Sequence, residues 1–246
     1  MIYIYDGSFN GLLTAVFEAY YRHEEPAEIR TVINHQINIL DDTSYIATDT
    51  DKASRVYEAI VLKISEYCLQ DIYYTYLSNF EDSGTLVYRY LKLGFSVGKK
   101  LNMYQAHESV IAVRNIVYKV MGERHRLLGL LRFSKLDCGV YYAPVSPDHN
   151  VLELLAPHFA ERMGDQDWII HDTKRKTAAV CKSGTWYMTD FDSNQYDMVK
   201  ENEADYQAFW SSYYKNINIT ERSNINLQKR NMPVRYWKYL TEKQVN

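Results

Sequence analysis

The sequence lacks the features that would direct it to a membrane or out of the cell. Its 246 residues contain no apolar run as long as the roughly 18 residues of a membrane-spanning helix. The N-terminus, MIYIYDGSF, has neither the basic region nor the long apolar stretch of a secretory signal peptide. We therefore expect a soluble, cytoplasmic protein.

Cysteine is scarce, and its spacing argues against the usual thiolate sites. The three cysteines, Cys68, Cys138 and Cys181, are too far apart for a CxxC-type zinc site. Their odd number and wide separation also argue against a disulfide framework. Because no cluster-type spacing occurs, the chain by itself is not expected to hold an iron–sulfur cluster. We expect neither a cofactor nor a metal site.

Common motifs and a global positive charge are missing as well. The sequence has no GxxxxGK[ST], GxGxxG, HExxH or GxSxG pattern, and no HxE with PCxxC. The common nucleotide-binding, hydrolase and deaminase sites are therefore not visible. Net charge is −3, so any contact with nucleic acid would depend on a local basic patch. Tyrosine is abundant, at 23 residues. This favours an interface or a ligand groove, although a biased genome composition would give the same count.

The hydrophobic pattern predicts an α+β protein, with a mostly helical chain around a small antiparallel sheet module of ββαβββ order. Residues 2–5 predict a strand, and the 3.6-residue apolar spacing after Ser8 predicts a helix capped by that serine. A long helical stretch from about residue 49 should break at Gln70-Asp71. Further helices are expected over 83–93 and 104–122, the latter stopping at Gly122.

From Leu127 the period changes to that of strands. Two strands should precede a helix that is kinked or divided at Pro157, and three strands should follow it, the last two joined by a tight turn at Ser183-Gly184. The tail should be helical again, with an aromatic stripe over 206–214 and a last short helix from Pro233. The expected strands are 127–133, 140–145, 168–171, 177–181 and 185–188.

Three parts are predicted, packed as one body. The first, 1–125, is mainly helical; the second, 126–192, is the antiparallel sheet with its helix; the third, 193–246, is helical. No internal repeat or low-complexity linker separates them. The candidate functional residues therefore have to be sought within these parts.

The first candidate site is the turn Asp6-Gly7-Ser8, which joins a strand to a helix N-terminus. Unpaired backbone N–H groups at such a terminus can bind an anion, for example a DNA phosphate. In the alternative interpretation, Gly7 allows the bend and Ser8 caps the helix, without any ligand.

The second candidate is a possible catalytic set in the sheet module. An aspartate beside a histidine can orient the imidazole for acid–base chemistry. The hypothesis requires the side chains to converge in one pocket. In the alternative, an Asp–Arg pair closes a hairpin and a histidine packs under a helix. The residues are His158, His171, Asp172 and Arg175.

The third candidate is a basic and aromatic C-terminal segment. Cations can contact phosphates, and aromatic rings can stack on unpaired bases. The alternative is a solvated helix with its aromatic residues in the core, and the exposure of Trp237 distinguishes the two. The residues are Arg222, Lys229, Arg230, Arg235, Tyr236, Trp237 and Lys238.

Several segments together resemble a bacterial domain-of-unknown-function family. They are the opening YDGSF with Gly11, the run VLELLAPHF at 151–159, Asp172 with Arg175, and MPVRYW at 232–237. The likeness spans nearly the whole chain, and its specificity lies in the order and spacing of the motifs. Members of that family are associated with DNA repair or DNA metabolism, and occur beside a radical SAM protein or fused ahead of a uracil-DNA-glycosylase-like domain.

The resemblance implies a DNA-binding accessory protein whose radical SAM or glycosylase-type partner carries the chemistry. The lack of cluster cysteines is consistent with this division of labour. The resemblance implies no catalytic residues. Two alternatives stay open: an enzyme acting on nucleic acid through the His/Asp/Arg set, and a protein-interaction scaffold without DNA contact.

Overall fold

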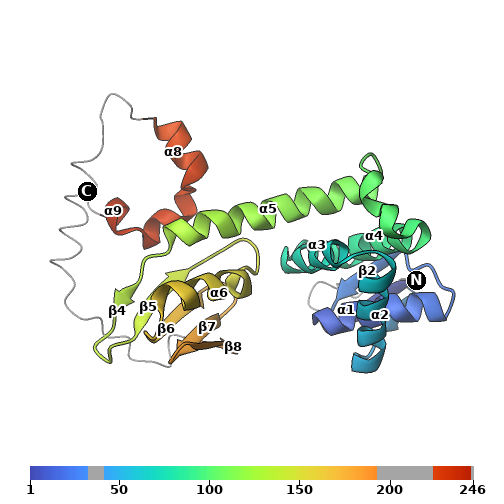
Figure 1. Ribbon diagram of the computed structural model, residues 1–246, viewed down its shortest axis with the longest axis horizontal. Coiled ribbons are helices and arrows are strands. Elements are labelled where there is room, and N and C mark those ends of the chain that lie inside the picture. Colours follow the sequence, from blue (N-terminus) through green and yellow to red (C-terminus); the bar gives the residue numbers. More distant parts are fainter. Residues whose placement is uncertain (33–41, 193–223, 245–246) are drawn as a thin grey trace. The chain divides into compact units, whose positions relative to one another are not determined.

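The computed structural model describes residues 1–32, 42–192 and 224–244. The chain divides into two compact units, Met1–Met121 and Gly122–Asn246 (Figure 1). Helix α5 (Glu108–Leu130) contributes residues to both units. No helix within the described ranges has the length and apolar character needed to cross a membrane. The predicted three-part division, packed as one body, stays a prediction.

Unit 1 is built on a three-stranded parallel sheet in which β1 lies between β2 and β3. Parallel strands with both faces covered are apolar throughout, and Tyr3, Ile4 and Tyr5 of β1 are at most 2% exposed. The predicted strand over residues 2–5 is thus confirmed. The elements are β1 (Ile2–Tyr5), α1 (Phe9–Tyr21), β2 (Glu28–Thr31), β3 (Thr43–Tyr45), α2 (Thr50–Lys63), α3 (Glu66–Leu77), α4 (Ser83–Val97) and the 3-10 helix η1 (Gly98–Met103).

Side-chain caps mark the start of three of these helices, α1, α2 and α3. The Ser8 hydroxyl accepts the N–H of Gly11 at 2.9 Å, which confirms the predicted cap of α1. The predicted break at Gln70-Asp71 is wrong, because both residues lie inside α3. The break comes earlier, where the Ser65 hydroxyl accepts the N–H of Cys68 at 3.1 Å and starts a new helix.

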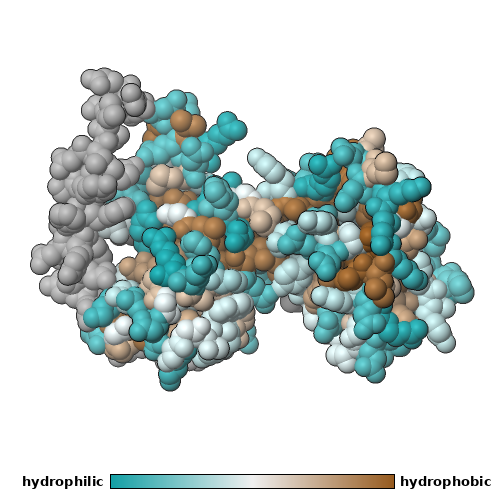
Figure 2. Space-filling model, in the orientation of Figure 1, coloured by the Kyte–Doolittle hydropathy of each residue, from teal (hydrophilic) through white to brown (hydrophobic). Residues whose placement is uncertain are grey.

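Apolar side chains gather over α1 and α2 on the face of unit 1 that Figure 2 shows. They line a hollow of about 330 Å³ that includes Phe17, Val56 and Phe95. The guanidinium of Arg55 lies 5.0 Å from the Phe17 ring. A cation over an aromatic face is a favourable contact. Since Arg55 also lines the hollow, the hollow combines apolar walls with a basic rim.

The contact between α4 and β2 leaves no space for a side chain at Gly84. A Cβ atom there would lie 2.5 Å from the backbone carbonyl oxygen of Ile29, which cannot rotate away. We therefore expect Gly84→Ala to lower the free energy of unfolding of unit 1 by about 1–3 kcal/mol, as overpacking does. Thermal unfolding followed by circular dichroism measures this loss.

Gly129 in α5 provides the control for this substitution. A Cβ atom at Gly129 meets nothing within 4 Å, so Gly129→Ala should leave stability unchanged or raise it by about 0.5–1 kcal/mol through helix propensity. Equal stability of Gly84→Ala and the wild type would contradict the close approach of α4 to β2.

Unit 2 contains a five-stranded sheet in the order β4-β5-β6-β7-β8. The α+β class is confirmed, but the predicted purely antiparallel module is wrong, because β5 and β6 pair in parallel. Helix α6 forms the crossover between them, and adjacent strands joined by such a crossover run in the same direction. The elements after α5 are β4 (Ser134–Lys135), β5 (Tyr141–Val145), α6 (Leu152–Met163), β6 (Trp168–Asp172), β7 (Thr177–Lys182), β8 (Thr185–Asp190), α8 (Ile225–Asn231), the 3-10 helix η4 (Val234–Tyr239) and α9 (Thr241–Gln244).

The predicted strand over 127–133 is also wrong, because α5 continues through Gly122 to Leu130. Leu127 is buried in line with Val120, which extends the apolar face of the helix. The last three predicted strands are confirmed as β6, β7 and β8. Ser183 and Gly184 between β7 and β8 both have positive φ, at 50° and 80°, as a type I′ hairpin turn requires.

Two further expectations concern the helices of unit 2. Helix α6 contains Pro157 and is not divided by it. The last short helix is present as η4 directly after Pro233, with 3-10 geometry. The predicted aromatic stripe over 206–214 lies outside the described residues.

Candidate functional site

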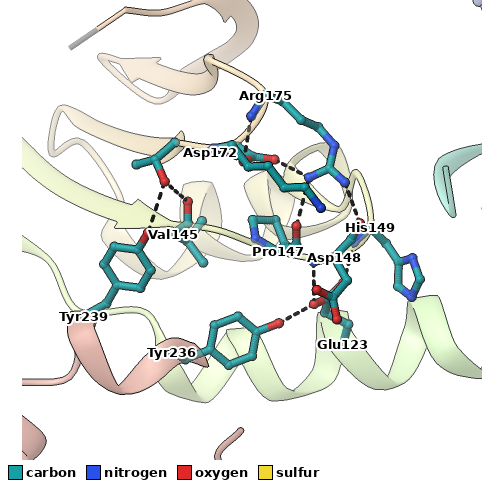
Figure 3. A network of polar contacts seen from close by, with 11 residues as sticks. Glu123, Val145, Pro147, Asp148, His149, Asp172, Arg175, Tyr236 and Tyr239 are labelled. Atoms are coloured by element: carbon teal, nitrogen blue, oxygen red, sulfur yellow. Dashed lines mark hydrogen bonds and ion pairs between the residues drawn. The ribbon is translucent and has the colours of Figure 1, made fainter. Parts of the chain in front are cut away.

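A buried carboxylate, Glu123 of α5, joins three segments of unit 2 (Figure 3). Its Oε1 accepts the backbone N–H of Asp148 at 2.9 Å, and its Oε2 accepts that of His149 at 2.8 Å. The Tyr236 hydroxyl also donates to Oε1. Glu123 therefore connects α5 to the loop that follows β5 and to η4.

These hydrogen bonds hold Glu123 in its ionised form. Burial alone would raise the pKa of this carboxyl. The hydrogen bonds from Tyr236 and the two backbone amides together outweigh burial, so the pKa of Glu123 lies below its usual value. Burial and the bond to Glu123 in turn raise the pKa of Tyr236. Arg235 lies 3.5 Å from Glu123 and 2.7 Å from Asp148, with its side chain 42% exposed. The carboxylate is therefore stabilised mainly by neutral donors.

A second buried carboxylate, Asp172, organises the turn after β6. Its Oδ1 accepts the backbone N–H of Lys174 at 2.9 Å and that of Arg175 at 3.2 Å. Its Oδ2 accepts from the Arg175 guanidinium at 2.6 Å, and the Asp172 side chain is fully buried. The same guanidinium donates to the carbonyl oxygens of Pro147 and Asp148, at 3.0 and 2.6 Å (Figure 3). Glu123 thus holds the loop that follows β5 directly, and Asp172 holds the same loop through Arg175.

His171 does not join this network, although it precedes Asp172 in the sequence. Consecutive side chains of a strand point to opposite faces of the sheet, and His171 faces Tyr142 and Phe191. Its Nδ1 lies 2.7 Å from the Tyr142 hydroxyl, and its ring centroid lies 4.9 Å from that of Phe191. Burial lowers the pKa of His171, and the smaller effect of nearby carboxylates does not restore it. Burial also raises the pKa of Tyr142, to about 12.

Of the four residues predicted to be catalytic, the structure brings only Asp172 and Arg175 into contact. His171 lies on the other face of β6, and His158 lies on α6 with its ring centroid 5.2 Å from that of Phe159. The convergence that the catalytic hypothesis required is not found. The arrangement of Asp172 and Arg175 corresponds to the alternative, an Asp–Arg pair that closes a hairpin.

The predicted DNA-binding segment separates into a structural part and an exposed part. Tyr236 is 1% exposed and belongs to the core of unit 2. Trp237 is half-buried; its indole N–H donates to the carbonyl oxygen of Met232 at 2.8 Å, and the Lys243 ammonium lies 4.6 Å from its ring. The exposed cations of the predicted set are Lys229, Arg230 and Lys238, besides the ion-paired Arg235, whereas Arg222 lies outside the described residues.

A hydrogen bond brings the turn after β6 beside this segment. The Thr173 hydroxyl lies 3.0 Å from the Tyr239 hydroxyl (Figure 3). Two exposed lysines, Lys174 and Lys176, lie in the same turn, and Lys176 is 3.3 Å from Asp192. We call the exposed cations of the two segments the basic surface. It consists of Lys174, Lys176, Lys229, Arg230 and Lys238.

In the predicted anion-binding turn, Asp6-Gly7-Ser8, the carboxylate of Asp6 accepts hydrogen bonds from the polar groups around it. Oδ1 of Asp6 accepts the backbone N–H of Ser8 at 2.9 Å and its hydroxyl at 2.7 Å, and Oδ2 accepts the Thr48 hydroxyl at 2.8 Å. Burial opposes these bonds but they outweigh it, so the pKa of Asp6 lies below its usual value. Gly7 adopts φ +91°, and a Cβ atom at Gly11 would lie 2.3 Å from Oδ1 of Asp6. The geometry is that of the capping alternative, and anion binding stays a prediction.

Sequence reasoning missed Glu123, which accepts hydrogen bonds from three residues of this network. A signal was present: Glu123 shares the helical face of Val120 and Leu127, both at most 1% exposed. A charged residue on an apolar helix face is seldom buried unless it is paired. What the sequence could not show was the partner, because Tyr236 is 113 positions away.

Comparison with known proteins identifies a family but no function. Within the described residues, no group of three or more His, Cys, Asp or Glu side chains is placed to hold a metal ion. Searches among curated proteins and among solved structures found no match. A family model matches residues 81–242, which is 162 of the 246 residues and includes Glu123, Asp172 and Tyr236. The chain therefore belongs to the family described as a domain of unknown function, DUF4130.

Proposed function

We propose that this protein is a DNA-binding accessory factor in DNA repair or modification, and that the basic surface of unit 2 contacts the phosphate backbone. A partner of radical SAM or uracil-DNA-glycosylase type would supply the chemistry. The observation that carries the proposal is the hydrogen bond between Thr173 and Tyr239, because it joins two cation-bearing segments far apart in the sequence. With a net charge of −3, the chain depends on such a local cluster to attract DNA.

The anchoring of the C-terminal segment supports this assignment. Tyr236 and Arg235 tie η4 to Glu123 and Asp148, so the cations beside them are held by a fixed backbone. Phosphate contacts need cations that are exposed and held in register with the backbone of the nucleic acid. Lys238 is an exposed cation on the anchored η4, and α8, which precedes η4, adds the exposed Lys229 and Arg230.

An accessory role fits the site better than an enzymatic one. The side chains of His171 and Asp172 point to opposite faces of β6, whereas the enzyme alternative needs them in one pocket. A protein-interaction scaffold without DNA contact remains an outcome of the test: it would bind the partner protein and no form of DNA.

The test is DNA binding by the full chain as a function of salt, with and without the partner. The slope of log K against log salt is negative for DNA binding. Changing Lys229, Arg230 and Lys238 to Gln should make this slope shallower by about 0.9 for each phosphate that is no longer neutralised, hence by up to about 3. Affinity should fall to a similar extent for all DNA sequences, since phosphate contacts carry no sequence information. Fluorescence anisotropy with labelled duplex, single-stranded and lesion-bearing DNA measures both quantities.

A matched control removes the same charge from unit 1. Arg89, Lys99 and Lys100 are exposed there, and their replacement by Gln should leave the salt slope unchanged. Equal effects of the two triple variants would show that net charge and not the basic surface matters. Absence of binding to every form of DNA, both with and without the partner, would refute the proposal.

A further inference from the structure

A cleft of about 510 Å³ opens in unit 1 between α3, α4, η1 and the first part of α5. Clefts of this size are typical of sites for small molecules. This cleft differs from the hollow over α1 and α2, because an acidic side chain and two amide side chains line it in addition to basic and apolar ones. Its polar residues are Asp71, Asn102, Gln105 and Arg114.

Asp71 gives the cleft a hydrogen-bond acceptor that the protein does not saturate. The hydroxyl of the buried Tyr90 donates to Oδ2 of Asp71 at 3.2 Å, and it is the one hydrogen-bond donor to this carboxylate among the residues that the structure describes. Burial raises the pKa of Asp71, and the smaller effects of Tyr90 and Arg114 do not cancel the rise. A partly desolvated carboxylate with unused lone pairs is stabilised by a ligand that donates to it.

Two tyrosines that line the cleft have most of their surface in solvent. Tyr67 is 72% exposed and Tyr118 is 81% exposed. Each lies one helical turn from an ionisable residue of the cleft, Tyr67 from Asp71 on α3 and Tyr118 from Arg114 on α5. Residues four apart share one face of a helix, so each helix presents a ring and a charge side by side.

The chemistry of the ligand follows from these groups. The exposed rings suit a flat aromatic ligand, which stacks on tyrosine faces. Asp71 requires a donor on the edge of that ligand, and the amides of Asn102 and Gln105 can meet both donors and acceptors. Arg114 adds a cation for an attached anion. A purely apolar ligand would leave Asp71 with Tyr90 as its one donor among the described residues, and a simple anion would be repelled by the carboxylate.

We infer that this cleft binds an unpaired nucleobase that carries an exocyclic amino group. Asp71 accepts from the amino group, Tyr67 and Tyr118 contact the ring, and Arg114 meets the phosphate. The base can belong to a free nucleotide or to single-stranded DNA, since both present the same edge. The inference goes beyond the proposed function, because a nucleotide can bind here whether or not the basic surface of unit 2 binds DNA.

The experiment titrates the full chain with dAMP, dGMP, dCMP and dTMP, followed by calorimetry. The first three should bind more tightly than dTMP, because thymine offers a single ring N–H and no amino group. Asp71→Asn should remove this preference, since an amide also pairs with the carbonyl oxygens of thymine. Tyr118→Ala should weaken binding about 5- to 150-fold, the range expected when one ring that stacks on a base is removed.

Further arms separate the ligand sources and the two proposals. Arg114→Gln should weaken binding of the monophosphates and not of the corresponding nucleosides. Short oligonucleotides that bind more tightly than any monomer, with the same sensitivity to Tyr118→Ala, identify single-stranded DNA as the ligand. The triple variant of Lys229, Arg230 and Lys238 should retain mononucleotide binding, so failure of DNA binding in unit 2 does not imply failure of the cleft.

Two controls keep the outcome decisive. Tyr57 on α2 is 48% exposed and is not among the residues that line the cleft, so Tyr57→Ala should bind nucleotides as the wild type does. Circular dichroism verifies that the exposed-tyrosine variants fold. Absence of binding for all four nucleotides, equal affinity for dTMP and the others, or an unchanged preference in Asp71→Asn would each overturn the inference.

Discussion

Replacing Glu123 with alanine is expected to lower the free energy of unfolding of unit 2 by about 3–5 kcal/mol, since each buried donor left without an acceptor costs about 1–3 kcal/mol. The substitution strands the backbone N–H groups of Asp148 and His149 and the hydroxyl of Tyr236. Arg235 adds little to the loss because its side chain is 42% exposed. All four tryptophans lie between positions 168 and 237, so tryptophan fluorescence during urea unfolding reports on unit 2.

Three other variants define the origin of this loss. Glu161→Ala changes an exposed residue of α6 and should stay within about 0.5 kcal/mol of the wild type. Tyr236→Phe removes a single donor to Glu123 and should cost less than Glu123→Ala. Glu123→Gln should be intermediate, because its NH₂ group faces a backbone N–H that the carboxylate oxygen had accepted. A loss below about 1 kcal/mol for Glu123→Ala would show that the carboxylate is not the centre of the network.

The sign of the pH dependence follows from the lowered pKa of Glu123. Unfolding returns this group to its ordinary pKa of 4.5, so the unfolded chain binds the proton more tightly than the folded one. The stabilisation is therefore complete above pH 4.5 and declines as the pH falls through the folded-state pKa. Glu123→Gln should show a shallower loss of stability in that acidic range than the wild type.

Replacing Asp172 with alanine is expected to cost a similar amount, about 3–5 kcal/mol, because a buried ion pair would lose one partner. Asp172 is fully buried and the Arg175 side chain is 15% exposed, so the guanidinium would lose the buried counter-charge that Asp172 supplies. The N–H groups of Lys174 and Arg175 would also lose their acceptor. Tryptophan fluorescence in urea measures the loss.

A conservative variant separates the turn from the ion pair. Asn at position 172 can still accept the two backbone N–H groups, so Asp172→Asn should lose the charge interaction and keep the turn. The free energy of unfolding of Asp172→Asn should lie between those of the wild type and Asp172→Ala. Asp165→Ala, an exposed acid after α6, serves as the control with little effect. Equal stability of Asp172→Ala and Asp165→Ala would contradict a buried ion pair.

Local patterns predicted the elements whose signals are local. The hairpin of β7 and β8 follows from alternating residues around Ser183-Gly184, and the cap of α1 follows from Ser8 ahead of an apolar helical face. The end of α5 was mispredicted because the run LLGLLRF at 127–133 is apolar enough to fit either period, and length does not decide between them. The parallel pairing of β5 and β6 required attention to the helix between them.

The same distinction between local and distant contacts applies to the candidate site. Asp172 and Arg175 are three residues apart, and their contact was within reach of sequence reasoning. Alternation along a strand could have separated His171 from Asp172 as soon as residues 168–171 were assigned to a strand. The bond from Tyr236 to Glu123 spans 113 positions, and no local rule relates such distant residues. The cleft around Asp71 likewise draws on four elements.

The long span between Glu123 and Tyr236 also sets an order of events during synthesis. The chain must grow by 113 residues after Glu123 before its hydroxyl donor exists, which takes about 6 to 23 s at typical translation rates of about 5–20 residues per second. All five strands of the sheet leave the ribosome before that donor does. Unit 2 is therefore expected to complete its fold only after Tyr236 has left the ribosome, and until then the acidic side chain of Glu123 lies without this donor on a helix face that is otherwise apolar.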